Sequence, residues 1–476
     1  MKKIINLITI LTFNLSLFSQ SAQTSNDPLF ISGFEKYKQK LYKESYQDYS
    51  NFLLKSPKDN VALYNRGLCS YELKNYKTAI NDFKESIDIG GKSADAFWML
   101  GACKYWLKEY KEAIVDFDFC LEIKPDHYKA LAFKGAANNS LGNYEEALKY
   151  LNASSDIDKT YEPTFLFKTI SKYYLKDYKG SFEDSEKALA LYDNYETHFW
   201  KGLVLICLKK YKEALSEYDL AIQKNSKHSK AYYNRALAYF DMGEYMKSIE
   251  DNTKCIEIEP SFSLAYYNRG LAYFYFGSYV KAETDFNSAI AFGLNDYKVY
   301  CYRGANYYLQ KKDELALPDL NKSIELNKDY ETSYYYRAFL KYANKDDKGC
   351  IEDCNKSLAL EKKHDVYYTR GIAKYGLQDF NGAIEDFNEA IKLKSNYSLA
   401  LLERGVTYFM LEKDDMAMDD LNNAIKIRNN NARAYYYRGK LKKIKNDTAG
   451  ACTDLKTAQK LGYPWATEEI IKNGCK

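Results

Sequence analysis

The sequence predicts an all-α protein built from stacked helix hairpins, and three observations support this. A small residue recurs at thirteen aligned positions, at steps of 34 residues except for two steps of 33. A second small residue, always Ala, Ser or Cys, follows each of these after twelve positions. Apolar residues recur at helical spacing around both, and only 7 Pro occur in 476 residues. A period of this length, kept in phase, is typical of a solenoid whose units pack only on their neighbours.

The first 21 residues are predicted to be a secretory signal peptide (1–21) rather than part of the repeat. Lys2 and Lys3 form a basic start, and residues 4–18 follow as an uncharged, mostly apolar run. Small residues at 19–21 then supply a plausible cleavage site, and the run is short for a membrane-spanning helix. An uncleaved membrane anchor is the alternative. The sequence therefore predicts an exported protein that is periplasmic or associated with the cell envelope.

Thirteen tandem units fill residues 26–463, and each is predicted to be a hairpin of two helices. In the second unit, Tyr64 and Leu68 lie one helical turn apart and predict an apolar face on the first helix. Phe83 and Ile87 do the same for the second helix, and a polar corner separates the two. Helices of about 12–14 residues are marginal alone, so each hairpin must bury its apolar faces against the next one.

Residues 464–476 follow the last unit and are predicted to form a capping helix, because a solenoid needs a terminal element with a polar outer face. Pro464 can open this helix at its first position, which proline tolerates best. Cys452 lies on the last unit's second helix and Cys475 lies just beyond the cap. An antiparallel return of the chain would bring the two together, so a disulfide between them is expected.

Two stretches of the chain resemble a known family. Residues 232–239, with the sequence Tyr-Tyr-Asn-Arg-Ala-Leu-Ala-Tyr, are followed by Ser248, Ile249 and Pro260; residues 97–101 are followed by Ala113, Phe117 and Pro125. This pattern resembles the tetratricopeptide repeat, and in-phase copies extend the resemblance over nearly the whole mature chain. The resemblance implies a right-handed superhelical solenoid of helix-turn-helix hairpins, whose concave face is lined by the first helix of each hairpin.

A charged pattern repeats with the hairpins. The residue before the aligned small position is basic in eleven units, and an acidic residue lies sixteen positions further on in twelve. A catalytic site would need one pair in unusual surroundings, so many near-copies indicate a structural ladder of ion pairs. The pairing can run within a hairpin or between adjacent hairpins. The ladder comprises Arg235, Asp251, Arg269, Asp285, Arg303, Asp319, Arg337, Asp353, Arg370, Asp386, Arg404 and Asp420.

Aromatic side chains recur at two positions of the predicted first helices, the fifth and the twelfth. By the family resemblance these positions lie on or beside the concave groove, where large, rigid side chains can grip a peptide or helix. The alternative is that many of them pack between helices. The lysine and asparagine with which chaperone-binding members hold a carboxylate are replaced, for example by Tyr233 and Leu237. The groove candidates are Tyr64, Trp98, Phe199, Tyr233, Phe240, Tyr267, Phe274, Tyr308, Tyr335, Tyr342, Tyr368 and Tyr436.

The sequence predicts no enzymatic site, no cofactor and no metal centre. No group of His, Cys, Asp and Glu has metal-ligand spacing, and no phosphate loop or nucleophile motif is present. The 69 basic and 65 acidic residues leave a formal charge of +4, which indicates neither nucleic acid nor an anionic membrane surface as a partner. After the predicted signal peptide, no segment is apolar enough to span a bilayer.

The sequence therefore predicts an exported, non-enzymatic scaffold that binds protein or peptide partners along the groove. The word binding rests on fold analogy. The alternative is a repeat protein that binds a cell-envelope glycan, because rows of aromatic rings can also stack on sugars. The sequence identifies neither the partner nor the oligomeric state.

Overall fold

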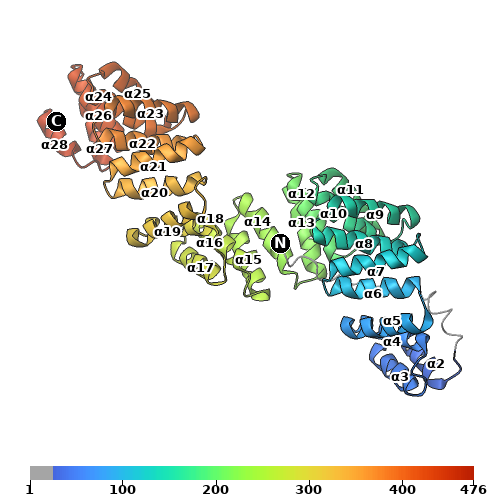
Figure 1. Cartoon of the computed structure of the whole chain (residues 1–476). Helices are drawn as coiled ribbons and strands as arrows, with labels where there is room; N and C mark the ends of the chain where they lie inside the picture. The colour runs from blue at the N-terminus through green and yellow to red at the C-terminus, as the bar shows by residue number, and fades with distance from the viewer. Residues whose placement is uncertain (1–24, 476) are drawn as a thin grey trace. The chain divides into compact units, whose positions relative to one another are not determined.

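The computed structural model of the chain describes residues 25–475, which contain 27 α-helices and no strand (Figure 1). The predicted signal peptide, residues 1–21, lies outside the described residues. The chain divides into two compact units, one ending at Glu244 and the other beginning at Tyr245. The prediction of an all-α solenoid of helix hairpins is confirmed.

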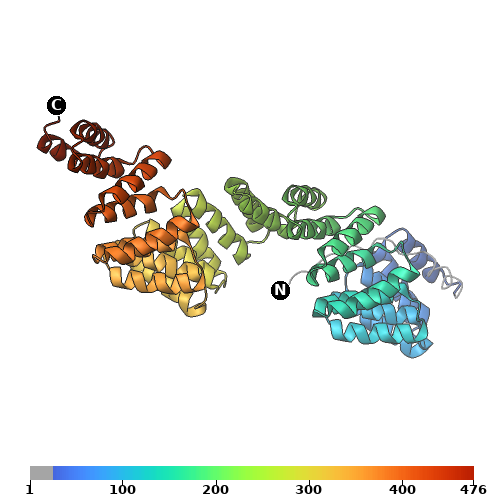
Figure 2. The same cartoon turned by 90° about the horizontal axis from the view of Figure 1, so that it is seen from above.

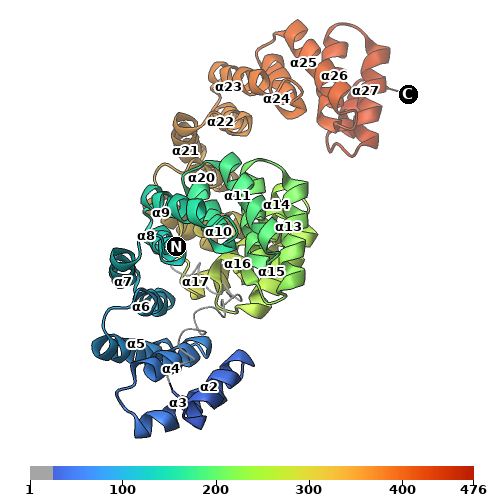
Figure 3. The same cartoon turned by 90° about the vertical axis from the view of Figure 1, so that its right-hand side faces the viewer.

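The first unit contains six hairpins and one further helix, and the hairpins pack side by side in chain order (Figure 3). Its helices are α2 (Pro28–Lys38), α3 (Tyr42–Lys55), α4 (Asn60–Glu72), α5 (Tyr76–Gly90), α6 (Ala94–Trp106), α7 (Tyr110–Ile123), α8 (Tyr128–Leu141), α9 (Tyr144–Ile157), α10 (Glu162–Tyr174), α11 (Tyr178–Leu191), α12 (Tyr195–Cys207), α13 (Tyr211–Lys224) and α14 (Ser229–Asp241).

The second unit begins with one helix, continues with six hairpins and ends with a short helix (Figure 2). Its helices are α15 (Tyr245–Ile258), α16 (Ser263–Phe276), α17 (Tyr279–Ala291), α18 (Tyr297–Leu309), α19 (Asp313–Leu326), α20 (Glu331–Ala343), α21 (Asp347–Leu360), α22 (His364–Gly376), α23 (Phe380–Leu393), α24 (Ser398–Met410), α25 (Asp414–Ile427), α26 (Ala432–Ile444), α27 (Thr448–Lys460) and α28 (Ala466–Lys472).

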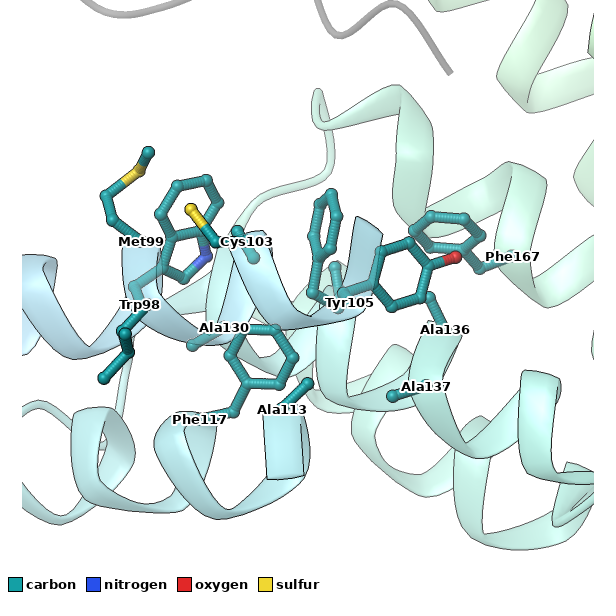
Figure 4. Packing of buried hydrophobic residues seen from close by; sticks show 14 of the residues in the cluster. Trp98, Met99, Cys103, Tyr105, Ala113, Phe117, Ala130, Ala136, Ala137 and Phe167 are labelled. Carbon is teal, nitrogen blue, oxygen red and sulfur yellow. The ribbon is translucent and has the colours of Figure 1, made fainter. Parts of the chain in front are cut away.

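The two helices of a hairpin approach each other closely at the aligned small residue. A Cβ atom added to Gly101 would lie 2.6 Å from the ring of Phe117, which packs under α6 in Figure 4. Ten of the thirteen repeats have glycine at this position, and Phe, Tyr or Leu follows sixteen residues later. Two repeats without glycine instead pair Thr169 with Ser185 and Ala338 with Cys354. A larger residue at one position is thus matched by a smaller one at the other.

The corner of each hairpin contains a residue in the left-handed conformation. Two corners use glycine there, at Gly142 and Gly277. The other ten have φ between 57° and 66° at Lys40, Lys74, Lys108, Lys176, Lys209, Lys311, Lys345, Gln378, Glu412 and Asn446. A side chain with a Cβ atom is disfavoured in this region by about 1 kcal/mol, so these corners carry backbone strain.

Exchanging glycine and lysine at two corners is expected to change stability in opposite directions. Lys74→Gly removes the steric cost at a positive φ and should raise the free energy of unfolding by about 1 kcal/mol. Gly142→Lys introduces that cost and should lower it by a similar amount. Urea unfolding followed by circular dichroism measures both changes. Equal effects of the same sign in the two variants would contradict this explanation.

In seven hairpins the repeated basic and acidic residues form ion pairs between the two helices, whereas Lys134 pairs with Asp118 of the preceding hairpin. Seven arginines donate hydrogen bonds 2.5 to 3.2 Å long to the aspartate sixteen residues later, three from Arg370 and two from each of the others. These aspartates are at most 7% exposed. Of the predicted ladder, this joins Arg269 with Asp285, Arg303 with Asp319, Arg337 with Asp353, Arg370 with Asp386 and Arg404 with Asp420. Arg235 and Asp251 belong to different units, and their pairing stays a prediction.

Five of these arginines also reach the preceding hairpin, through a nitrogen that the aspartate leaves unused. Arg303 donates to Asn287 at 2.8 Å, and Arg404 donates to Asn388 at 2.6 Å. The acceptor lies two residues after the ladder aspartate of the preceding hairpin, and Asn321, Asn355 and Asn422 occupy the same place further along. Each of these five arginines therefore ties its own two helices together and ties them to the neighbouring hairpin.

The end of the chain differs in detail from the predicted cap. Pro464 is not the first residue of the last helix. It precedes Trp465, which is the N-cap, and α28 begins at Ala466. A turn after α27 provides the change of direction, with Gly462 at φ +82°, so the proline follows that turn. Cys452 and Cys475 form a disulfide with their Cα atoms 5.4 Å apart, which links α27 to the residues beyond α28.

Candidate binding surface

The first helices of consecutive hairpins contact one another directly within each unit. In the first unit α6 contacts α8, α8 contacts α10, and α10 contacts α12; in the second unit the series runs from α16 through α18, α20, α22 and α24 to α26. These helices form a continuous side of each unit, which we call the first-helix face. Nine of the twelve predicted groove residues lie on these helices. Of the other three, Tyr64 lies on the first helix α4, and Tyr233 and Phe240 lie on α14, which contacts α12.

The structure divides the twelve aromatic candidates into two groups. Trp98, Phe199, Phe274 and Tyr436 are buried, with at most 8% of each residue exposed. The others remain partly exposed, and Tyr342 is the most open at 38%. This partly exposed group consists of Tyr64, Tyr233, Phe240, Tyr267, Tyr308, Tyr335, Tyr342 and Tyr368. Only the second group can offer ring surface to a ligand without a rearrangement of the helices.

Many of these rings also pack against other aromatic side chains of the repeat. The ring of Tyr368 lies 6.1 Å from that of Phe387 in its own hairpin and 5.4 Å from that of Tyr397, which precedes the next hairpin. Phe199 lies 4.9 Å from His228 in the same way. The ring at the fifth position of the first helix therefore packs between hairpins, and in some repeats it also remains partly exposed. The alternatives of helix packing and exposure on the groove side are thus not exclusive.

Three of the partly exposed tyrosines keep their phenol protons over a wide pH range. Burial raises the pKa of Tyr267, Tyr335 and Tyr368 well above its ordinary value of 10.0, and nearby acidic groups add to the increase. A protonated phenol can donate a hydrogen bond as well as accept one. The first-helix face of the second unit therefore presents neutral, hydrogen-bonding aromatic groups.

Two acidic residues of the first-helix face escaped the sequence analysis. Glu162, which is 8% exposed, begins α10 and accepts hydrogen bonds from Asn194 Nδ2 at 3.0 Å and Thr197 Oγ1 at 3.2 Å. Glu196 lies in the first turn of α12 and accepts a hydrogen bond from the Tyr195 hydroxyl at 3.3 Å. Both occupy the first turn of a first helix, where acidic residues are common, so the sequence alone gave no reason to single them out.

Burial shifts the ionisation of both carboxyl groups toward neutral pH. It raises the pKa of Glu162 to about 7, although the hydrogen bonds from Asn194 and Thr197 oppose the shift. It raises the pKa of Glu196 to about 8, where the hydrogen bond from Tyr195 opposes the shift and the charge of Glu162 adds to it. The two carboxyl groups are therefore close enough to affect each other's ionisation.

The second unit contains a matched case with the opposite outcome. Glu331 begins α20 as Glu162 begins α10, and Lys363 stands one residue before the next first helix, as Asn194 does. Glu331 and Lys363 form a salt bridge. Although burial alone would raise the pKa of Glu331, this lysine and Thr332 lower it below its ordinary value. At the corresponding position of the first unit, the side-chain amide of Asn194 takes the place of the ammonium group of Lys363.

Replacing Glu162 by glutamine is expected to stabilise the fold in a pH-dependent way. The carboxyl group ionises near 4.5 in the unfolded chain and near 7 in the folded chain, so its folded-state stabilisation is present below pH 4.5 and is lost as the pH rises toward 7. Glu162→Gln should therefore gain up to about 3 kcal/mol over the natural chain at pH 8, and little at pH 4. Urea unfolding at both pH values measures this, and an equal gain at both would contradict it.

His198 and His228 are two further titratable groups of the first unit. His198 lies 2.6 Å from Glu217 and 2.7 Å from Asp193, and burial lowers the pKa of His228 to about 4. Between residues 25 and 475, no three His, Cys, Asp or Glu side chains are arranged to hold a metal ion. None of the helices in that range is both long and apolar enough to cross a membrane.

Sequence comparison identifies the repeat in several parts of the chain. Profiles of the tetratricopeptide repeat match residues 128–161, 229–262 and 368–432. A profile described as subunit 3 of the anaphase-promoting complex, or cyclosome, matches residues 38–120. No curated protein sequence matches the chain.

Solved structures with a similar fold are helical repeat proteins. The APC/C hetero-tetramer Cut9–Hcn1 matches with 13% identity and a TM-score of 0.50 over 90% of this chain and 98% of that one. Yeast Tom70 is 18% identical, with a TM-score of 0.38 over 87% of this chain and 95% of that one. The C-terminal part of a TPR repeat-containing protein from Cytophaga hutchinsonii is 21% identical, with a TM-score of 0.39 over 48% and 94%. At 13% identity, the first of these likenesses supports the fold alone.

Proposed function

We propose that this chain, which belongs to the tetratricopeptide repeat family, is an exported scaffold that binds protein or peptide partners on the first-helix face. The family fold is typical of proteins that work through protein–protein interaction. The observation that carries the proposal is the presence, in each unit, of partly exposed aromatic side chains on the first helices, such as Tyr64 in the first unit and Tyr335 and Tyr342 in the second. Large aromatic residues with a polar tip are enriched at the centres of protein interfaces.

Site-specific photo-cross-linking tests where the partner binds. A photoreactive phenylalanine analogue placed at Tyr342, on the first helix α20, is expected to form adducts with other proteins in cells that produce this protein naturally. Val280, which lies on the second helix α17 and is 71% exposed, is the matched control site. Adducts at both sites to the same extent, or none at Tyr342, would refute binding on this face. Adducts with glycans at Tyr342 would favour the glycan-binding alternative.

The proposed export rests on the basic start and apolar run of the first 21 residues. If these residues are removed as a signal peptide, N-terminal sequencing of the protein purified from its natural cells should begin near Ala22. Fractionation of the same cells should place the protein in the periplasm or cell envelope. A protein that retains Met1 and occurs in the cytoplasm would contradict the proposal.

A further inference from the structure

The second helix of the third hairpin carries an apolar stripe on its exposed side. α7 packs on α6 of its own hairpin and on α8 of the next one (Figure 1). On the side that remains open, Val115, Phe119 and Ile123 follow one another at intervals of one turn and are 50%, 38% and 43% exposed. The partly exposed ring of Phe97 on α6 lies 5.3 Å from that of Phe119 and widens this surface. We call the three residues of α7 the α7 stripe.

The repeat itself does not account for the α7 stripe. At the position of Val115, eleven of the other twelve repeats have a polar or charged residue, and the twelfth has Pro318. At the position of Phe119, ten of the other twelve have a polar or charged residue. Packing inside a hairpin therefore requires neither side chain, because the other hairpins fold without them. Exposed apolar side chains that gather in one place are typical of a contact with another molecule.

The charged residues at the two ends of the stripe are arranged symmetrically about Phe119. Lys111 lies eight residues before it and Asp126 lies seven residues after it. Glu112 lies seven residues before it and Lys124 lies five residues after it. All four are exposed, and none of them forms a salt bridge with another residue between 25 and 475. Each cation before the stripe thus has an anion at a similar distance after it, and each anion has a cation.

We propose that the α7 stripe is a two-fold contact between two copies of this chain. With two α7 helices antiparallel and their Phe119 side chains opposite each other, Val115 of each copy opposes Ile123 of the other. The same register brings the charges at the start of one stripe close to the opposite charges at the end of the other. A two-fold interface must be self-complementary in this way. A parallel register would instead place each charge opposite its own copy.

The contact leaves the first-helix face of both copies open, so it goes beyond the proposed function and does not depend on it. A pair of chains offers two such faces, and binding of the second one to a partner with two sites becomes intramolecular. One pair of helices is a small interface beside the about 1,200–2,000 Å² that stable complexes bury. We therefore expect a weak dimer whose population depends on the protein concentration.

Sedimentation equilibrium of the natural chain over about a hundredfold range of concentration tests the association. We expect a reversible equilibrium between monomer and dimer. Phe119→Glu should weaken the dimer at least about tenfold, because it places two carboxylates at the centre of an apolar contact. The variant should fold, since Glu85 and Glu389 occupy the same position in other hairpins, and circular dichroism checks this. A natural chain that stays monomeric, as it does if the stripe binds only a different protein or a lipid surface, overturns the inference.

Leu220 on α13 provides a matched control for this variant. It occupies the position that Phe119 occupies on α7, and it is also 38% exposed. Ser216 and Lys224 lie one turn before and one turn after it, so α13 has no apolar stripe. Leu220→Glu should therefore leave the dimer unchanged. Equal weakening by the two variants would show that the added charge acts without regard to its place, and would overturn the inference.

Cysteine cross-linking tests the antiparallel register. Phe119→Cys should form a disulfide between two copies on mild oxidation, because the two-fold axis passes between the two residues. Val115→Cys should not cross-link to itself, whereas a mixture of Val115→Cys and Ile123→Cys chains should cross-link. Leu220→Cys and the natural chain, in which Cys207 is the one partly exposed free thiol between residues 25 and 475, are the controls. Self-cross-linking of Val115→Cys as efficient as that of Phe119→Cys would contradict this register.

Exchanging charges at the ends of the stripe tests the pairing of the two copies. Lys111→Glu and Asp126→Lys should each weaken the dimer by about threefold to tenfold, because each change acts twice in a two-fold contact. The double variant reverses both partners and should recover most of the loss. Losses that simply add in the double variant would overturn the proposed pairing, and with it the antiparallel contact.

Discussion

Phe286→Ser is expected to lower the free energy of unfolding by about 3–5 kcal/mol, because it removes a fully buried ring from the contact between α16 and α17. The ring lies against Gly270, where an added Cβ would come within 2.8 Å of it. Little else can fill the space, because the glycine has no side chain to move. Urea unfolding monitored by circular dichroism gives the change in the unfolding midpoint.

The chain itself indicates how to recover this loss. In the fifth repeat Thr169 occupies the place of Gly270, and Ser185 occupies the place of Phe286. Both residues are buried. Gly270→Thr alone should cost about 1–3 kcal/mol, because its side chain collides with the ring. In the double variant, threonine fills the space that serine leaves, so the total loss should be smaller than the sum of the two single losses by at least about 1 kcal/mol. Strictly additive losses would show that the two positions do not compensate each other.

Removing one ladder aspartate is expected to be equally damaging. Asp420→Ala leaves Arg404, which is 20% exposed at its side chain, without the two hydrogen bonds of 2.7 Å that the aspartate accepts. Loss of one partner from a buried ion pair costs about 3–5 kcal/mol, since the remaining charge stays desolvated. The free energy of unfolding of the variant should fall by an amount near the lower end of this range, because water partly reaches the guanidinium group.

Two further variants separate the ladder from ordinary surface charge. Glu325→Ala removes an exposed pair with Lys322 and should change stability by less than about 1 kcal/mol. Asn388→Ala removes the bond from Arg404 to the preceding hairpin and should cost about 1–2 kcal/mol. A null effect of Asp420→Ala in the same measurements would mean that the ladder contributes nothing to stability.

The period of the sequence was sufficient to predict the hairpins, because every copy repeats the same apolar spacing and the same close approach. It could not decide how the ladder pairs, since the acid of either hairpin fits the spacing. The structure shows that Arg404 reaches two hairpins at once, bonding to Asp420 in its own and to Asn388 in the preceding one. The asparagine was visible in the sequence, but only the geometry of a planar guanidinium group with several donors connects it to the arginine.

The size compensation between Gly270 and Phe286 was likewise present in the sequence and overlooked. The alignment drew attention to positions that are always small, and the partner sixteen residues later is usually large. The link between the two positions becomes apparent only where both depart from the usual glycine and large residue, as they do at Ala338 and Cys354. In three dimensions the reason is direct, because the two side chains share one space between the helices.

The candidate binding surface was predictable as a set of positions but not as a set of exposed side chains. The sequence placed Trp98 and Tyr342 in the same class, yet the first is 7% exposed and the second 38%. Exposure depends on the following hairpin, since that hairpin covers the ring or leaves it open. Glu162 and Glu196 were missed for a similar reason, because a missing cation at Asn194 is recognised only when the neighbouring hairpin is in place.

The disulfide between Cys452 and Cys475 determines how the carboxyl end of the array loses order. Terminal repeats of helical arrays fray first, because each is held from one side only. Here α28 cannot separate fully from α27 unless the disulfide is reduced, because the bond closes the intervening chain into a loop. An oxidising compartment therefore protects this end against carboxypeptidases and against mechanical pulling, and a reducing one removes that protection.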